Sequence, residues 1–141
     1  MVDEFTSNAL YNAPLDASGC RRFAHLPRTQ EVVLDEDEAV EVSFVSDGSR
    51  IGISVADPFG SLQVETVQAY LSRCLRRGDD QINNKDGGAG LGLYCSLESL
   101  SHLIINIKKN YRTELIGLLD VSGTHRDFAS RGKSFSIFMD G

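Results

Sequence analysis

The segment from residue 88 to residue 93 has the composition of a phosphate-binding loop. It reads Gly-Ala-Gly-Leu-Gly-Leu and leads directly into an apolar pattern of helical spacing. Glycine lets the backbone approach an oxyanion closely, and the free N–H groups and dipole of a helix N-terminus favour negative charge. The loop lacks the Lys-Ser/Thr ending of a Walker loop and the preceding strand of a dinucleotide-binding unit. A plain glycine-rich helix cap stays open as the alternative.

Glu4 and Asn8 stand four residues apart, so they share one face of the helix expected at the N-terminus. A carboxylate there can orient a water molecule or a hydroxyl group. An amide oxygen one turn later can ligate Mg²⁺ without neutralising its charge. In isolation, a solvated acid and an exposed amide explain the pair more simply.

Asp57 directly follows a predicted strand, within the segment Ala-Asp-Pro-Phe-Gly over residues 56–60. A carboxylate at a strand end can accept a hydrogen bond from an exocyclic amine. A base without that donor leaves the acceptor unpaired, at a cost of about 1 to 3 kcal/mol. The position therefore suits adenine recognition, and an ordinary turn acid beside proline and glycine is the alternative.

The elements that must position these residues follow from the hydrophobic pattern. Residues 2–13 favour a helix, which Pro14 ends. Residues 14–38 read as a surface connection with one short strand near 32–34. Alternating apolar residues over 40–55, interrupted by Asp-Gly, predict a β-hairpin.

The second half alternates between helical and strand patterns. Apolar residues recur at helical spacing after residue 60 and end at a cationic turn and Gly78. A polar, glycine-rich loop and a second helix follow. We expect one α+β domain with a mixed, mainly antiparallel sheet, whose later elements are a loop over 78–90, a helix over 91–101 and strands over 103–108, 113–121 and 134–139.

Composition excludes several classes of function. The chain of 141 residues carries a formal charge of -6, which argues against general affinity for the phosphate backbone of nucleic acid. No apolar run approaches the roughly 18 residues that span a bilayer, and no signal-peptide pattern opens the chain, so we expect a cytoplasmic protein. Its three cysteines are far apart, with no C-x-x-C pair.

Four motifs, taken in order, resemble those of the GHKL ATPase superfamily, which includes gyrase and the histidine kinases. They are Glu4-x-x-x-Asn8, Asp57-x-x-Gly60, Gly88-x-Gly90-x-Gly92 and the segment over 132–137 that reads Gly-Lys-Ser-Phe-Ser-Ile. The match spans nearly the whole chain. The resemblance implies a Bergerat-type ATP-binding fold, a two-layer α/β sandwich with helices packed on one face of the sheet.

The resemblance also implies roles by position, with ATP and Mg²⁺ as cofactors. Asn8 would ligate Mg²⁺, and Glu4 would be the general base. Asp57 would hold the adenine amine, Gly60 would line the base pocket, and Ser134 would lie near the adenine. The phosphate end of the site would be formed by Gly88, Gly90, Leu91 and Gly92.

The sequence departs from the family pattern at two places. The family's first glycine box usually reads Asp-x-Gly-x-Gly, whereas Pro58, Phe59 and Ser61 surround a single glycine here. The helix bearing Glu4 opens the chain, whereas relatives have a strand and a helix before it. We therefore expect a single ATP-binding domain over 1–141 that lacks this N-terminal strand and helix. The charged segment over 124–132 is a candidate partner-contacting loop.

Two classes of function stay open. The small size and the retained Glu4 favour an anti-sigma-like serine/threonine protein kinase or a regulatory ATPase. The altered segment over 57–61 favours a nucleotide-sensing or degenerate partner-binding module without phosphotransfer. Either function implies a protein partner or substrate in a signalling pathway, and a homodimer is open. A self-sufficient histidine kinase is excluded, because none of the histidines (His25, His102, His125) has the acidic neighbour of a phosphoacceptor.

Overall fold

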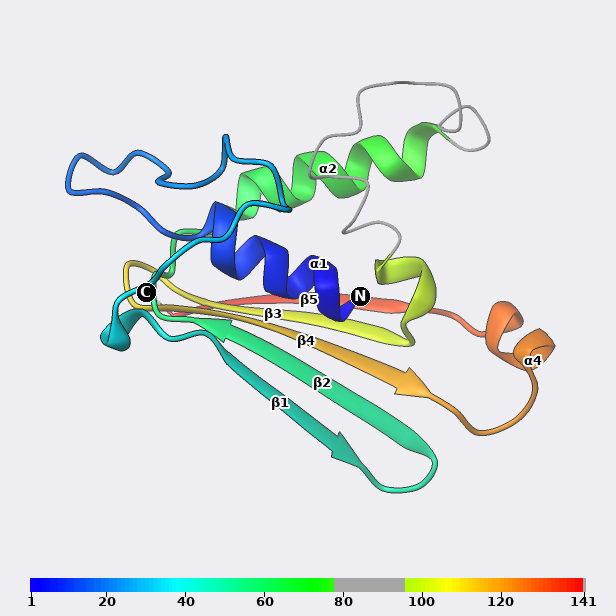
Figure 1. Cartoon of the computed structure of the whole chain (residues 1–141). Helices are drawn as coiled ribbons and strands as arrows, with labels where there is room; N and C mark the ends of the chain where they lie inside the picture. Colours follow the sequence, from blue (N-terminus) through cyan, green and yellow to red (C-terminus); the bar gives the residue numbers. More distant parts are fainter. Residues whose placement is uncertain (78–95, 141) are drawn as a thin grey trace.

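Five strands form one open sheet in the order β1-β2-β4-β3-β5 in the computed structural model of the chain (Figure 1). The structure describes residues 1–77 and 96–140. Neighbouring strands are antiparallel except β3 and β5, which run parallel, so the sheet is mixed, as predicted. The chain is an α+β protein, which confirms the predicted class. The strands are β1 (Glu41–Ser46), β2 (Arg50–Asp57), β3 (His102–Lys108), β4 (Arg112–Asp120) and β5 (Ser134–Asp140).

β1 and β2 form the predicted hairpin. Asp47 holds its turn, because the Oδ1 atom accepts hydrogen bonds from the backbone N–H groups of Ser49 and Arg50 at 2.9 and 2.7 Å. Gly48 has a φ of 91°, a left-handed conformation that glycine adopts without steric cost. β2 ends at Asp57, so the hairpin carries this carboxylate to one end of the sheet.

The N-terminal helix and α2 (Val64–Arg77) lie over the same face of the sheet (Figure 1). α1 (Val2–Ser7) continues directly into a π-helical turn, η1 (Asn8–Asn12). In this turn the Ala13 N–H donates to the Asn8 carbonyl oxygen, five residues back, at 3.0 Å. Both helices were predicted, whereas the π turn was not.

The core lies between these helices and the sheet. Phe5 and Ala9 from the N-terminal helix and Val67 and Leu71 from α2 meet apolar side chains on three strands. Burying one large apolar side chain completely contributes about 1.5 to 3 kcal/mol. This contact therefore fixes both helices to one face of the sheet. The strand residues of the core are Val55, Leu103, Ile105, Ile107 and Leu115.

The connection between η1 and β1 contains little regular structure. Leu15 and Arg21 form an isolated antiparallel bridge, and a short 3-10 helix, η2, covers Glu36–Glu38. Arg22 pairs with Glu38 at 2.5 Å and so links an interior part of the connection to the part just before β1. The short strand predicted near 32–34 is wrong, because these residues adopt no strand and pair with no neighbouring strand.

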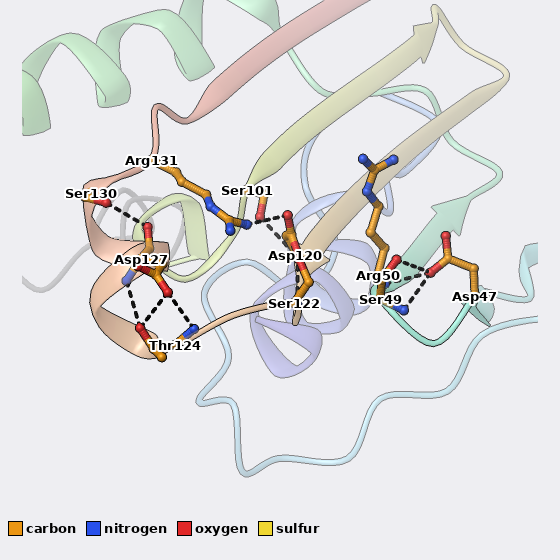
Figure 2. A network of polar contacts seen from close by, with 10 residues as sticks. All are labelled: Asp47, Ser49, Arg50, Ser101, Asp120, Ser122, Thr124, Asp127, Ser130 and Arg131. Atoms are coloured by element: carbon orange, nitrogen blue, oxygen red, sulfur yellow. Dashed lines mark hydrogen bonds and ion pairs between the residues drawn. The ribbon is translucent and has the colours of Figure 1, made fainter.

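The chain between β4 and β5 contains a short helix, α4 (His125–Ser130), where the sequence predicted a charged loop. Thr124 caps it. Its Oγ1 accepts from the Asp127 N–H at 3.3 Å, and Asp127 Oδ2 accepts from the Thr124 N–H at 2.9 Å. Arg131 then pairs with Asp120 at the end of β4, with 2.6 Å between Nη1 and Oδ2 (Figure 2). The contact with a partner stays a prediction.

Two further sequence predictions concern residues that the structure describes only in part. Residues 96–99 are helical and belong to the helix predicted over 91–101. The start of that helix and the predicted loop over 78–90 lie outside the described residues. Over residues 1–77 and 96–140, no helix has the length and apolarity needed to cross a membrane.

Candidate functional site

A cavity of about 180 Å³ lies between the N-terminal helix, the start of α2 and strands β2, β3 and β4. Its apolar wall includes Phe5, Val55, Ile105 and Leu115, which also belong to the core. Its polar groups come from the N-terminal helix, the connection that follows it, the ends of β2 and β4, the turn after β2 and the start of α2. They are Asn8, Asn12, Arg21, Asp57, Ser61, Thr66 and Thr113. An apolar cavity with few convergent polar groups is the usual form of a small-molecule site.

Asp57 is the acidic side chain among the described residues that line this cavity, and only 7% of its surface is exposed. Its Oδ1 atom accepts hydrogen bonds from the N–H groups of Phe59 at 2.9 Å and Gly60 at 3.3 Å. Burial raises the pKa of Asp57 to about 6, because desolvation of the charge outweighs these hydrogen bonds. The carboxyl is therefore mainly ionised and an acceptor at pH 7, but mainly a neutral donor at pH 5.

Thr113 stands directly across from Asp57 in the pairing of β2 with β4. Only 3% of its surface is exposed, and its Oγ1 has no hydrogen-bond partner among the residues that the structure describes. A buried hydroxyl without a partner costs about 1 to 3 kcal/mol. The sequence reasoning missed Thr113, because the residue belongs to no local motif. Only the strand register places it beside Asp57.

Gly60 supports the Asp57 turn from behind and does not line the cavity. Its φ is 58°, and a Cβ atom there would overlap the Lys108 carbonyl oxygen. Gly60 is therefore required by the close approach of the turn between β3 and β4. Its neighbour Ser61 does line the cavity, and the Ser61 hydroxyl donates to the Ala13 carbonyl oxygen at 2.8 Å.

Glu4 and Asn8 share one helix face, as predicted, and Asn12 extends the row. Asn8 Nδ2 donates to Glu4 Oε1 at 3.3 Å, and Asn12 Nδ2 donates to Asn8 Oδ1 at 2.6 Å. The two asparagines line the cavity, whereas Glu4 lies just outside it. The sequence reasoning missed Asn12, although its spacing of four from Asn8 repeats the first interval and was a usable signal.

Of the remaining predicted site residues, the structure describes only Ser134, which does not line this cavity. Ser134 lies exposed at the start of β5, where its hydroxyl contacts His102 Nδ1 at the far end of β3 from Thr113. Gly88, Gly90, Leu91 and Gly92 lie outside the described residues. In the part of the chain that the structure covers, no cluster of three or more His, Cys, Asp or Glu side chains has the arrangement of a metal site.

Comparison with protein-family models, with curated proteins and with solved structures gave no match to this chain. The features of the cavity with the clearest chemical meaning are its paired buried groups, Asp57 and Thr113.

Proposed function

We propose that this chain is an ATP-binding signalling domain whose cavity holds one edge of the adenine base against Asp57 and Thr113. The observation that carries the proposal is the side-by-side placement of a buried carboxylate and an unpartnered buried hydroxyl. Adenine presents an amine donor next to a ring-nitrogen acceptor. The ionised Asp57 would accept from the amine, and the Thr113 hydroxyl would donate to the ring nitrogen. The bound base would thus supply the partner that Thr113 lacks.

The size and lining of the cavity support a ring system as its occupant. At about 180 Å³, it is smaller than the roughly 300 to 1,000 Å³ of sites that enclose a whole drug-sized ligand. Val55, Ile105 and Leu115 offer apolar contact to a flat base. The ribose and phosphates would then extend toward the exposed side of the site.

The fold gives further support. Both α1 and α2 lie on one face of the mixed sheet (Figure 1). The cavity is lined by residues of the N-terminal helix, α2 and strands β2, β3 and β4. This arrangement agrees with the two-layer, Bergerat-type sandwich that the motifs resemble. The proposal therefore includes that fold as well as its ligand.

The side-chain oxygen atoms of Glu4 and Asn8 on the helix are of the kind that ligates Mg²⁺, which prefers carboxylate and carboxamide oxygens. Asn8 would hold the ion through Oδ1, whose second lone pair is not used by the bond from Asn12. The ion would neutralise phosphate charge. The ion would lie beside the N-terminal helix. The phosphates of a nucleotide whose base occupies the cavity would reach the ion if they extended along this helix.

Glu4 would supply the proton acceptor for phosphoryl transfer, as in a serine/threonine protein kinase or a regulatory ATPase. A hydroxyl oxygen of the substrate or of water would form the new bond to the γ-phosphorus, and the bond to the ADP oxygen would break. The hydroxyl proton would pass to Glu4. The hydrogen bond from Asn8 holds one carboxylate oxygen of Glu4 and so fixes its orientation.

A nucleotide-sensing or partner-binding module without phosphotransfer is the second candidate. The position of Glu4 outside the cavity lining favours this second candidate. A general base must come within hydrogen-bond reach of the attacking hydroxyl group. Incubating the domain with radiolabelled ATP and a cell lysate separates the two. Labelled protein or released phosphate that disappears in Glu4→Gln supports transfer, and no label despite measured ATP binding supports sensing.

The binding proposal is tested by calorimetric titration of ATP with Mg²⁺ into wild type and Thr113→Val. Valine keeps the shape of threonine but cannot donate to the base. We expect the variant to bind roughly tenfold more weakly, since one buried hydrogen bond contributes about 1 kcal/mol or more. Thr124→Val, at the exposed N-cap of α4 and outside the cavity lining, is the matched control and should bind as wild type does. Equal binding by all three proteins would contradict the adenine site.

A further inference from the structure

The connection after η1 wraps around the end of the N-terminal helix. We call its residues 14–34 the strap. The Tyr11 hydroxyl donates to the carbonyl oxygens of Arg28 at 3.0 Å and Gln30 at 2.6 Å. The Arg28 guanidinium lies 4.6 Å from the centre of the Tyr11 ring and donates to Asn12 Oδ1 at 3.0 Å. The strap is therefore fastened to the same helix turn that lines the cavity.

Arg21 is the strap residue that reaches the cavity. Its backbone pairs with Leu15 in the isolated bridge, which turns the strap back toward the helix. The Arg21 side chain then lines the cavity, and its Nη1 donates to the Asn12 carbonyl oxygen. Arg28, in contrast, touches Asn12 but does not line the cavity.

Charge is divided between the two ends of the site. Asp57 is its buried acid, and Arg21 is the one basic side chain among the lining residues that the structure describes. Arg21 is exposed, so it stands at the solvent side of the cavity. A ligand that satisfies both ends has a neutral amine donor inside and an anionic group outside. A nucleotide has this pattern.

A guanidinium group has the chemistry to bind that anionic end. It carries five N–H donors in a planar fork, and the bond to the Asn12 carbonyl uses only one nitrogen. The other donors match the spacing of phosphate oxygens, which arginine often binds in a bidentate manner.

We propose that Arg21 binds the phosphate end of the nucleotide, so that the strap forms one wall of the binding site. The inference rests on the proposed ATP-binding function and adds a residue to it that no motif in the sequence marks. The competing explanation is that Arg21 only caps the carbonyl groups at the end of η1, since cations are favoured there. The two explanations differ in how affinity depends on phosphate.

The test compares ATP with adenosine, which lacks phosphate, by calorimetric titration into wild type and Arg21→Gln. We expect the affinity of Arg21→Gln for ATP to fall roughly tenfold, since charge-assisted hydrogen bonds contribute about 1.5 kcal/mol or more. Its affinity for adenosine should equal that of wild type. Arg126→Gln removes the same charge from an exposed position on α4 and should leave both affinities unchanged. Arg21→Lys, which keeps the charge but loses the fork, should show an intermediate loss for ATP.

The outcomes separate this inference from the function on which it rests. If wild type binds neither ligand, the proposed function fails and the role of Arg21 fails with it. If wild type binds ATP but Arg21→Gln loses nothing, or loses equally for ATP and adenosine, only the Arg21 inference is overturned. A lower melting temperature with an unchanged ratio of the two affinities identifies Arg21 as a helix cap. If Arg21→Gln does not fold, the ATP-to-adenosine ratio in Arg21→Lys decides.

Discussion

At the scale of single residues, Asp57 couples the site to the stability of the domain. Its carboxylate is buried in a largely apolar cavity and accepts hydrogen bonds from the backbone N–H groups of Phe59 and Gly60. Burial raises the pKa of Asp57 to about 6 despite these bonds. A residue kept at such a position lowers stability when it is ionised. The carboxylate that we propose to recognise the base therefore also lowers the stability of the folded domain.

Replacing Asp57 by asparagine should stabilise the domain at neutral pH. The pKa of Asp57 is about 6 in the folded state and about 3.9 in an unfolded chain, so between these values the folded state binds more protons. Stability of wild type therefore falls as pH rises from about 4 to about 6, by up to about 3 kcal/mol. Asp57→Asn removes this loss and retains an acceptor oxygen for the turn.

Urea unfolding of both proteins from pH 4 to pH 8 measures the effect. The stability gained in Asp57→Asn should be small at pH 4 and reach its plateau above pH 7. Asp16→Asn is the control and should lower the stability at neutral pH instead of raising it. Hydrogen bonds from the Ser18 side chain and the Cys20 backbone hold the pKa of Asp16 below its usual value, so its ionised form stabilises the fold. A difference between Asp57→Asn and wild type that does not change with pH would contradict the burial argument.

The residues of the site differ in how far the sequence could reveal them. Asp57 and Asn8 were predicted, because a strand end and a helical interval of four are local patterns, and both line one cavity. Thr113 was not predicted. It lies beside Asp57 only through the register of β2 with β4, and the two residues are 56 positions apart in the chain. Ser134 was chosen by motif order alone, and the structure leaves it at the other end of β3.

At the scale of elements, local turn chemistry separates the predicted parts from the missed ones. The hairpin was predictable because the Asp47 side chain and Gly48 determine the turn without help from the rest of the chain. α4 was missed, since a helix of six residues shows too few apolar positions to reveal its period. It depends on its cap and on the ion pair of Arg131 with Asp120 (Figure 2).

Thr124→Ala should therefore destabilise α4. The alanine cannot accept from the Asp127 N–H, and it leaves the Asp127 carboxylate with the backbone bond alone. Loss of an N-cap of this kind costs about 0.5 to 2 kcal/mol. Amide hydrogen exchange should become faster over 125–130 and remain as in wild type at β2 and β4. Thr29→Ala, outside any helix cap, is the control. Unchanged exchange over α4 would show that the ion pair alone maintains the helix.

At the scale of the whole molecule, the two faces of the sheet have different roles. One face carries the helices, the core and the cavity. On the other, Glu114 accepts hydrogen bonds from Ser54 at 2.7 Å and Asn106 at 3.2 Å, which link three strands with polar groups. Polar links of this kind suit a predominantly antiparallel sheet with a solvated face. The sequence predicted the mixed sheet, but the order of its strands required long-range pairing that periodicity does not contain.

Because the cavity is bounded by the N-terminal helix, α2 and the sheet, a ligand in it should stabilise the domain as a whole. ATP with Mg²⁺ at 100 times its dissociation constant should add about 2.7 kcal/mol to the free energy of unfolding. For a domain of this size, the melting temperature should rise by several degrees. The rise should shrink at pH 5, where Asp57 is mainly protonated.

Differential scanning calorimetry with ATP, and with inorganic triphosphate as a control without the base, measures this effect. We expect the larger rise with ATP. Equal rises for the two ligands would show that phosphate alone is bound, and an ATP effect that grows at pH 5 would contradict the role of ionised Asp57.

The π-helical turn at η1 has a further consequence for how this helix evolves and can be engineered. A π turn contains one residue more than an α-helical turn, and each α-helical residue advances about 100° around the axis. The extra residue is accommodated within the turn itself, so the side chains before and after it keep the directions they would have in an uninterrupted α-helix. Deleting one residue from Asn8–Asn12 should therefore restore a regular helix and leave Phe5 in the core. The insertion thus changes the spacing of side chains only within the turn, which includes Asn8 and Asn12 of the cavity lining.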